Sequence, residues 1–111
     1  VEMDEYRRPF INDGMARLPT LVWPRQLPID NEPLDVCKVV ERYSQLLGKS
    51  DVSKLFINAD PGVIVTSRIK EFVRSWPNQT EVTVKGLHFI QEDSPDEISS
   101  ALSDWLQGIP I

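Results

Sequence analysis

The single histidine among the 111 residues, His88, is the side chain whose chemistry stands out in this sequence. It lies in the stretch KGLHFIQEDSPDEI, between an alternating apolar run and a serine followed by proline and acidic residues. An imidazole has an ordinary pKa of about 6.5, so it can accept and return a proton near neutral pH. A loop histidine that is bonded to nearby backbone is the alternative, and the spacing alone leaves both roles open.

Four carboxylates and one cysteine are the remaining candidates for chemistry. The carboxylates Glu92, Asp93, Asp96 and Glu97 lie where a helix is expected to begin. A helix N-terminus stabilises a carboxylate by a few tenths to about 1 kcal/mol, so this cluster requires no metal ion. Cys37 has no second cysteine and only one histidine as a possible co-ligand, so we expect a buried small hydrophobe rather than a reactive thiol or a metal ligand.

The histidine follows a predicted strand–helix–strand unit. Residues 54–58, KLFIN, form a short apolar run before the turn sequence DPG, which is typical of a strand buried on both faces. Residues 66–76 have apolar side chains at helical spacing and stop before Pro77. Residues 81–86 alternate with β-branched side chains and end at a glycine, which indicates a second strand. We assign the glycosylation-like NQT at residues 78–80 to the turn between them.

Two further helices flank this unit. Residues 33–47 have apolar side chains at helical spacing, with a proline at the start and a glycine just past the end. A last helix is predicted from Pro95 to about Gly108, with Ser94 as its side-chain cap in a capping box.

This order of elements predicts an α/β fold in which the two strands are parallel and the crossover is right-handed. Two parallel strands alone leave both sheet edges unpaired, so the sequence predicts further strands upstream of Val1. Ligands bind at the carboxyl ends of parallel strands. The loops ADPGVI and GLHFIQED both fall at that edge, which places His88 at a predicted site above the sheet.

The first 30 residues differ from the rest. Met3, Tyr6 and Phe10 are spaced nearly as on a helix, whereas RLPTLVWPRQLPID contains too much proline for regular structure. We therefore expect a short helix and an irregular segment lying on a larger body. The start, VEMDEYRRPF, has neither an initiator methionine nor the order of a signal peptide, which indicates a segment of a longer protein.

Composition argues against two classes of partner. The 12 Lys and Arg residues against 17 Asp and Glu residues give a net charge of -5 without a basic stripe, so nucleic acid is not an expected partner. No apolar run approaches the roughly 20 residues that span a bilayer, so no membrane partner is expected. We expect a cytoplasmic protein.

Four blocks of sequence, LVWPRQLPI, KLFINADPGVI, WPNQTEVTV and LHFIQEDSPDEI, together resemble the C-terminal part of haloalkane dehalogenases. This family of the α/β-hydrolase superfamily uses no cofactor. The resemblance covers the chain and implies the last two parallel strands of an α/β-hydrolase fold, their flanking helices and the end of the helical cap. It assigns residues 1–32 to the end of the cap and its connection to the core. It assigns residues 33–111 to the C-terminal part of the core.

The resemblance also implies residue roles. In that family an aspartate displaces halide from an alkyl carbon to form an ester, a histidine activates the water that hydrolyses it, and an acid orients the histidine. His88 corresponds to this base and Phe89 to a pocket-lining aromatic. The other residues that the resemblance places around the substrate pocket are Trp23, Pro24, Leu27, Val63 and Ile64. Ordinary packing of the cap on the core is the alternative role for the cap tryptophan and the aliphatic side chains.

Several catalytic groups of the family have no match in this chain. We expect the nucleophilic aspartate, the halide-binding tryptophan and asparagine, and the orienting acid in the upstream half of the same enzyme. The acid often follows the strand equivalent to KLFIN, but Gly62 stands at the aligned position, and Asp60 is expected to point elsewhere. Asn58 is interpreted as a strand-end hydrogen bonder rather than a halide ligand.

Three functional hypotheses follow. The first is hydrolysis of a haloalkane by water to an alcohol, a halide ion and a proton, without cofactor or metal. The second is a coelenterazine luciferase of the Renilla type, a monooxygenase on the same scaffold, which VKGLHF and QED followed by PDE also resemble. The third is an inactive fragment that contributes only packing surface to a partner chain.

Overall fold

The computed structural model describes residues 2–109, which form two compact units divided between Ser44 and Gln45. Helix α3 (Leu34–Leu47) crosses this division and confirms the helix predicted for residues 33–47. The assignment of cap and core, with its boundary after residue 32, stays a prediction. Among the described residues, no helix combines the length and the apolar character needed to cross a bilayer.

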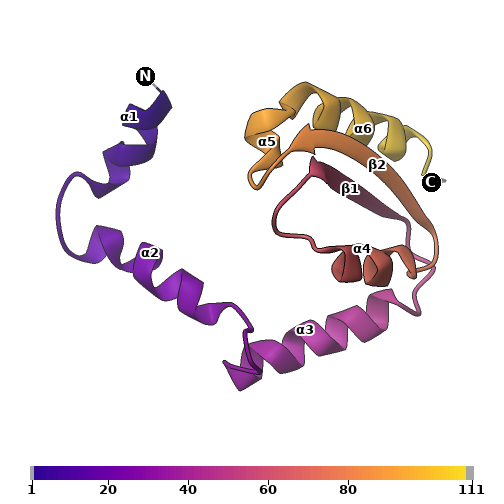
Figure 1. Cartoon of the computed structure of the whole chain (residues 1–111), viewed down its shortest axis with the longest axis horizontal. Coiled ribbons are helices and arrows are strands. Elements are labelled where there is room, and N and C mark those ends of the chain that lie inside the picture. The colour runs from indigo at the N-terminus through magenta and orange to yellow at the C-terminus, as the bar shows by residue number, and fades with distance from the viewer. Residues whose placement is uncertain (1, 110–111) are drawn as a thin grey trace. The chain divides into compact units, whose positions relative to one another are not determined.

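The first unit consists of short helical turns (Figure 1). The helix α1 (Glu2–Arg7) continues into the 3₁₀ turn Arg8–Phe10. A second run joins the 3₁₀ turn Met15–Arg17, α2 (Leu18–Val22) and the 3₁₀ turn Trp23–Gln26. The expected short helix is confirmed, but the proline-rich segment is helical as far as Gln26, where irregular structure was predicted, and only residues 27–30 are irregular.

Two prolines explain why that prediction was wrong. Pro19 and Pro24 each lie in the first two positions of a helical turn. A proline there removes an N–H that has no partner within the helix, and its fixed φ suits helical geometry. The position of a proline within a turn, rather than the number of prolines, decides whether a helix can form.

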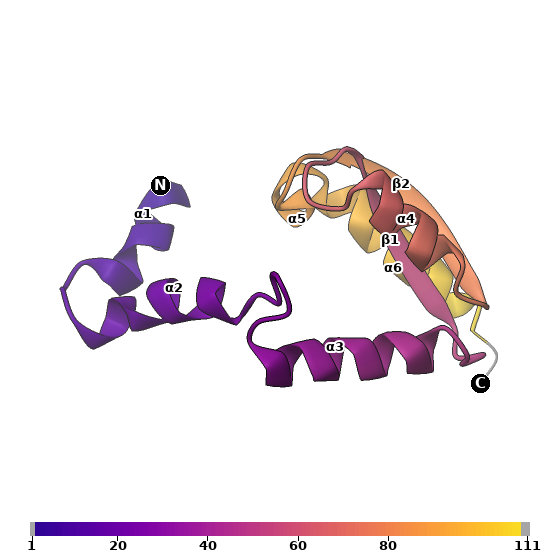
Figure 2. The same cartoon turned by 60° about the horizontal axis from the view of Figure 1, so that its bottom comes forward.

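The second unit contains the predicted parallel strands. β1 (Lys54–Pro61) and β2 (Gln79–Gly86) pair in parallel from their first residues to their last. The crossover between them contains α4 (Ser67–Arg74), and α6 (Pro95–Gln107) follows β2. Figures 1 and 2 show α4 and α6 on opposite faces of this two-stranded sheet. The α/β fold with parallel strands and flanking helices is therefore confirmed.

Both strands are longer than the patterns that predicted them. β1 continues beyond its apolar run through Asn58 to Pro61, and β2 begins at Gln79 rather than at Glu81. Backbone pairing needs only N–H and C=O groups at the right spacing, so it extends past the apolar side chains. The predicted turn at residues 78–80 is confirmed only for Asn78, which has a φ of 51° and whose amide donates to the Asp51 carbonyl, because Gln79 and Thr80 belong to β2.

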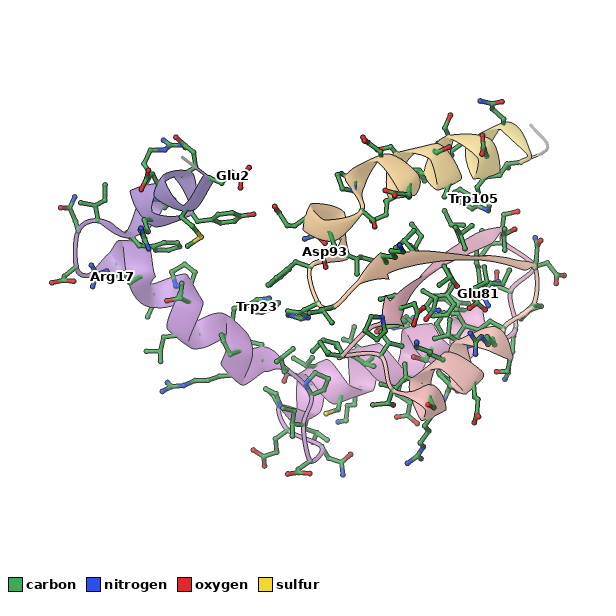
Figure 3. All side chains as sticks on the ribbon, turned by 45° about the horizontal axis from the view of Figure 1, so that its top comes forward. Glu2, Arg17, Trp23, Glu81, Asp93 and Trp105 are labelled. Carbon is green, nitrogen blue, oxygen red and sulfur yellow. The ribbon has the colours of Figure 1, made fainter. Side chains whose placement is uncertain are left out.

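Different interactions tie the two helices to the sheet. On one face, the Arg74 guanidinium of α4 donates to both carboxylate oxygens of Glu81, with Nε to Oε2 at 2.7 Å and Nη2 to Oε1 at 2.6 Å. On the other face, Val84 lines a cavity together with Ala101 and Trp105 of α6, the last of which is labelled in Figure 3. Val84 is 4% exposed, and among residues 2–109 it is the one apolar residue that is buried.

Helix α6 begins and ends where the sequence predicts, at Pro95 and before Gly108, but Ser94 does not cap it. The Ser94 hydroxyl instead donates to the carbonyl of Lys85 at 2.8 Å. A short helix that was not predicted, α5 (Ile90–Asp93), brings Ser94 back to the end of β2. There the buried strand-end carbonyl, rather than the helix N-terminus, is the partner of the hydroxyl.

Cys37 lies in α3 and is half-buried rather than buried, so the prediction of a buried small hydrophobe is wrong in the degree of burial. It occupies the less exposed side of the helix together with Val36 and Val40. The apolar spacing therefore identified the correct side of the helix but overestimated its burial.

Candidate active site

His88 lies two residues beyond the end of β2, in the loop before α5. This is the carboxyl edge of the parallel strands, as the sequence predicts. The side chain is exposed, and its ring contacts that of Phe89 with centroids 4.2 Å apart and planes inclined by 53°. Across residues 2–109 no hydrogen bond to the imidazole is formed.

The loops that follow the two strands run side by side. The Gly62 N–H donates to the Gly86 carbonyl, and the Val63 N–H donates to the Leu87 carbonyl, both at 3.0 Å. Backbone hydrogen bonds between the two segments thus continue to Val63, two residues beyond β1, and to Leu87, one residue beyond β2. As a consequence, the loop that carries Val63 and the loop that carries His88 are fixed to each other by backbone hydrogen bonds.

A small cavity of about 80 Å³ lies where the two loops meet. Val63, Ile64 and His88 all line it, together with apolar side chains of β1 and of the loops. The family resemblance predicts one site for these three residues. The structure brings them together, and the surroundings of the histidine are mainly apolar.

Lys70 of α4 also lines this cavity and was not identified from the sequence. Its ammonium group donates to the carbonyl of Ala59 at 3.2 Å. The side chain is half-buried, whereas a lysine on a helix normally faces water. Only the fold, which places this turn of α4 beside the end of β1, reveals its position.

The remaining predicted pocket residues lie outside this cavity. Phe89 is next to His88 in sequence and 60% exposed. Trp23 and Pro24 lie in the last 3₁₀ turn of the first unit, with Leu27 at its C-terminal end. Trp23 is 69% exposed within that unit. The pocket roles of these four residues stay predictions.

Gly62 occupies its position for a backbone reason. Its φ is 62°, and a Cβ there would lie 2.9 Å from the Ala59 carbonyl oxygen. A carboxylate-bearing residue at this position would therefore be strained. Asp60 lies exposed in β1, and no hydrogen bond joins it to His88 in the part of the chain that the structure describes.

Asn58 is a hydrogen bonder, as predicted, but not at a strand end. It lies within β1, is 7% exposed, and its Nδ2 donates to Thr83 Oγ1 at 3.2 Å. The prediction placed the end of β1 three residues too early because the apolar run stops there. The side chain instead joins the two strands across the sheet.

The acidic cluster divides into two roles. Asp93 accepts a hydrogen bond from the Leu87 N–H at 3.0 Å, so it interacts with the histidine loop. Asp96 and Glu97 lie in the first turn of α6, as the helix-start interpretation predicts. Within residues 2–109 no group of three or more histidine, cysteine and carboxylate side chains is arranged to hold a metal ion.

The chain contains a parallel βαβ unit followed by a histidine-bearing loop at its carboxyl edge, and its similarity to solved dehalogenase structures places it in the α/β-hydrolase class. The structure is similar to that of the haloalkane dehalogenase DatA from Agrobacterium tumefaciens C58, with a TM-score of 0.82 and 31% sequence identity. The similarity covers 96% of this chain and 37% of that chain. No family model matches the sequence.

Curated relatives narrow the comparison within this class. The chain is 55% identical over 106 residues to a haloalkane dehalogenase from Sphingobium indicum and 54% identical over 109 residues to one from Mycolicibacterium smegmatis. These matches cover 96% and 97% of this chain but only 36% and 35% of the relatives. In sequence and fold the chain is thus similar to part of the haloalkane dehalogenases, as the resemblance predicted, and it spans about a third of the length of these relatives.

A protein with a different activity is also similar. The coelenterazine h 2-monooxygenase from Renilla reniformis is 40% identical over 111 residues, which cover 97% of this chain and 35% of that protein. The identity is lower than that to the two dehalogenases over a comparable length. The comparison therefore favours the dehalogenases over the luciferase.

Proposed function

We propose that this chain is the base-bearing part of an enzyme that hydrolyses haloalkanes to an alcohol and a halide ion. The observation that carries the proposal is the apolar cavity at the carboxyl edge of β1 and β2, where His88 lies beside Val63 and Ile64. An apolar cavity suits a substrate with few polar groups. The 54–55% identity to proteins named haloalkane dehalogenase supports the same reaction.

The proposed reaction has two chemical steps. First, an aspartate carboxylate attacks the carbon that bears the halogen: a carbon–oxygen bond forms, the carbon–halogen bond breaks, and halide leaves with the bonding electrons. Then water attacks the ester carbonyl carbon while His88 accepts a proton from it. The attack gives a tetrahedral intermediate. Its collapse breaks the bond between the carbonyl carbon and the alcohol oxygen, the alcohol oxygen takes up a proton, and the aspartate is restored. The net reaction consumes haloalkane and water and yields alcohol, halide and a proton.

The upstream part of the same enzyme is the proposed source of the nucleophile, the halide-binding groups and the acid that orients His88. The matched relatives are nearly three times as long as the segment that they share with this chain. Gly62, at the position aligned with the acid of many α/β-hydrolases, is required by its backbone conformation. An orienting acid on an earlier strand satisfies both observations.

The substitution His88→Phe in the complete protein tests this proposal. With 1-bromobutane, the variant is expected to release about one bromide per active site and then stop, because the ester forms but is not hydrolysed. Intact-mass measurement should show the added butyl group, while the unsubstituted protein turns over repeatedly. Normal multiple turnover by the variant would remove His88 from the mechanism.

The Renilla-type monooxygenase is the second candidate, because that protein is 40% identical to this chain. The same preparation should be mixed with coelenterazine in air and its light emission recorded. Light without bromide release from bromoalkanes would favour the monooxygenase. Bromide release without light would favour the dehalogenase, and neither activity would support an inactive fragment.

A further inference from the structure

The backbone of Leu87, directly before His88, is held by hydrogen bonds at both of its flanking peptide groups. Its N–H donates to Oδ2 of Asp93, and its carbonyl accepts from the N–H of Val63, both at 3.0 Å. One bond comes from the end of α5 and the other from the loop after β1. Together they fix the backbone from which the His88 side chain projects.

Asp93 is itself held in place at the junction between α5 and α6 (Figure 3). The next residue, Ser94, is 3% exposed, and its hydroxyl donates to the Lys85 carbonyl at 2.8 Å. The Ser94 N–H also donates to the Ile90 carbonyl at 2.8 Å. These bonds close the loop from Lys85 to Ser94 at its base, so the Asp93 carboxylate acts from a fixed point.

Gly86 leaves the space that the carboxylate needs. A Cβ at this position would lie 2.9 Å from Oδ2 of Asp93 and 2.9 Å from Cγ2 of Ile90. Contacts this short would force the carboxylate away from the Leu87 N–H. The glycine at the end of β2 and the aspartate at the end of α5 therefore form one arrangement around the same peptide.

We propose that Asp93 is a positioning residue for His88: by holding the backbone N–H of Leu87, it keeps the imidazole where it activates the water that hydrolyses the ester. This inference rests on the proposed function. In this proposal Asp93 acts through the backbone and not by contact with the substrate or the water. Its effect passes through the backbone of Leu87 and is confined to the step that uses the imidazole.

The experiment measures ester formation and ester hydrolysis separately, in single-turnover reactions of the complete protein with 1-bromobutane. Asp93→Ala is expected to slow hydrolysis by about tenfold or more, because small misplacements of a catalytic group cost up to about 100-fold in rate. Ester formation should stay within about twofold. Asp93→Asn keeps an oxygen that can accept the Leu87 N–H, so it should restore most of the hydrolysis rate.

Two further variants distinguish positioning from general destabilisation. Gly86→Ala leaves Asp93 in the sequence but crowds its carboxylate, so it should also slow hydrolysis selectively, and it serves as the test if Asp93→Ala does not fold. Asp96→Ala removes a neighbouring exposed carboxylate from the first turn of α6 and should leave the ratio of the two rates unchanged. An equal decrease of both rates in Asp93→Ala or Gly86→Ala would overturn the inference.

His88→Phe, measured in the same assay, separates this inference from the proposed function. If His88→Phe stops hydrolysis but Asp93→Ala and Gly86→Ala do not change the ratio of rates, the positioning role is wrong and the base assignment stands. If His88→Phe still hydrolyses the ester, the proposed function itself fails. A failure of Asp93→Asn to restore hydrolysis would also contradict the inference, because the acceptor oxygen would not be what matters.

Discussion

The hydrogen bonds within the two units join residues at different separations along the sequence. In the first unit, Arg8 Nε donates to Glu5 Oε2, three residues away, and Arg17 Nε donates to the Phe10 carbonyl, seven residues away. In the second unit, Lys54 Nζ donates to the Pro77 carbonyl across 23 residues, and Asn58 Nδ2 to Thr83 Oγ1 across 25. These bonds of the first unit join residues close in sequence, whereas those of the second unit join segments that are far apart in sequence.

This difference explains where the geometry of the candidate site comes from. His88, Val63 and Ile64 lie in the second unit, and the two loops that carry them are joined by backbone bonds. Their arrangement is therefore defined by contacts within that unit. Substitutions in the second unit should change stability more than comparable substitutions in the first.

The largest effect is expected for Lys54→Met. The ammonium group donates to the carbonyls of Ser50 at 2.6 Å, Val52 at 2.9 Å and Pro77 at 2.8 Å. Hydrogen bonds from charged donors contribute about 1.5–3 kcal/mol each, and partial exposure reduces this, so we expect a loss of about 2–3 kcal/mol in the free energy of unfolding. Urea denaturation of the complete protein measures it. The matched variant Lys38→Met in the first unit should lose about 0.5 kcal/mol or less, and equal losses would contradict the comparison.

A smaller effect is expected for Val84→Ala. Val84 is buried between β2 and α6, and removing two methyl groups costs transfer free energy and leaves a cavity. We expect about 1–2 kcal/mol from the shift of the denaturation midpoint. Val22→Ala, at a 40% exposed position of the first unit, should cost about 0.5 kcal/mol. A larger loss of unfolding free energy for Val22→Ala than for Val84→Ala would show that apolar packing stabilises the first unit more than the second.

Ser94→Ala is expected to cost about 1 kcal/mol, because the hydroxyl of the buried Ser94 no longer donates its partly buried hydrogen bond to the Lys85 carbonyl. Thr20→Ala is the matched control in the first unit. The Thr20 hydroxyl donates to the Arg17 carbonyl at 2.6 Å, but this bond is exposed and water can replace it. Thermal or urea unfolding should show a change of a few tenths of a kcal/mol for the control. Equal changes in the free energy of unfolding of the two variants would show that burial does not increase the contribution of the Ser94 hydrogen bond.

The smallest effect concerns the dependence of stability on pH. The hydrogen bonds from Arg74 lower the pKa of the Glu81 carboxyl below its ordinary value. Because the folded pKa is below the unfolded one, the pair contributes stability at neutral pH that is lost as the pH falls through the folded pKa. Glu81→Gln should therefore flatten the loss of stability as the pH falls below about 4.3, the ordinary pKa of a glutamate.

The control for this prediction is Glu5→Gln in the first unit. Its partner Arg8 lies three residues away, and both side chains are mostly exposed, so the ion pair contributes little. Denaturation midpoints of both variants and the parent should be compared from pH 7 to about pH 3. An unchanged pH profile for Glu81→Gln would show that its pair with Arg74 does not stabilise the fold.

The elements that were predictable are those with a strong apolar period. α3, α4 and both parallel strands follow from such patterns, and α4 ends two residues before the predicted stop. The short helix α5 has only four residues, which is too few for a period to be recognised. Side-chain partners were harder to predict, because the Ser94 hydroxyl bonds to a carbonyl nine residues earlier that only the folded loop brings near.

The candidate site was predictable in part. His88 was identified by its chemistry and its place after a strand, and Val63 and Ile64 by family resemblance. Lys70 was not, because a lysine on an amphipathic helix gives no sign that its ammonium group returns to a strand-end carbonyl. The hydrogen bond from the Leu87 N–H to Asp93 needs the space that Gly86 leaves free. The sequence does not show that these residues meet, so the bond is seen only in the folded structure.

The backbone hydrogen bonds beyond the ends of β1 and β2 restrict which changes in loop length the two following loops can tolerate. Because the Val63 N–H bonds to the Leu87 carbonyl, inserting or deleting a residue in either loop would shift one loop against the other and displace His88. Substitutions at Val63 and Ile64 change the shape of the cavity without altering loop length. A directed-evolution library for new substrates should therefore vary side chains here and keep both loop lengths fixed.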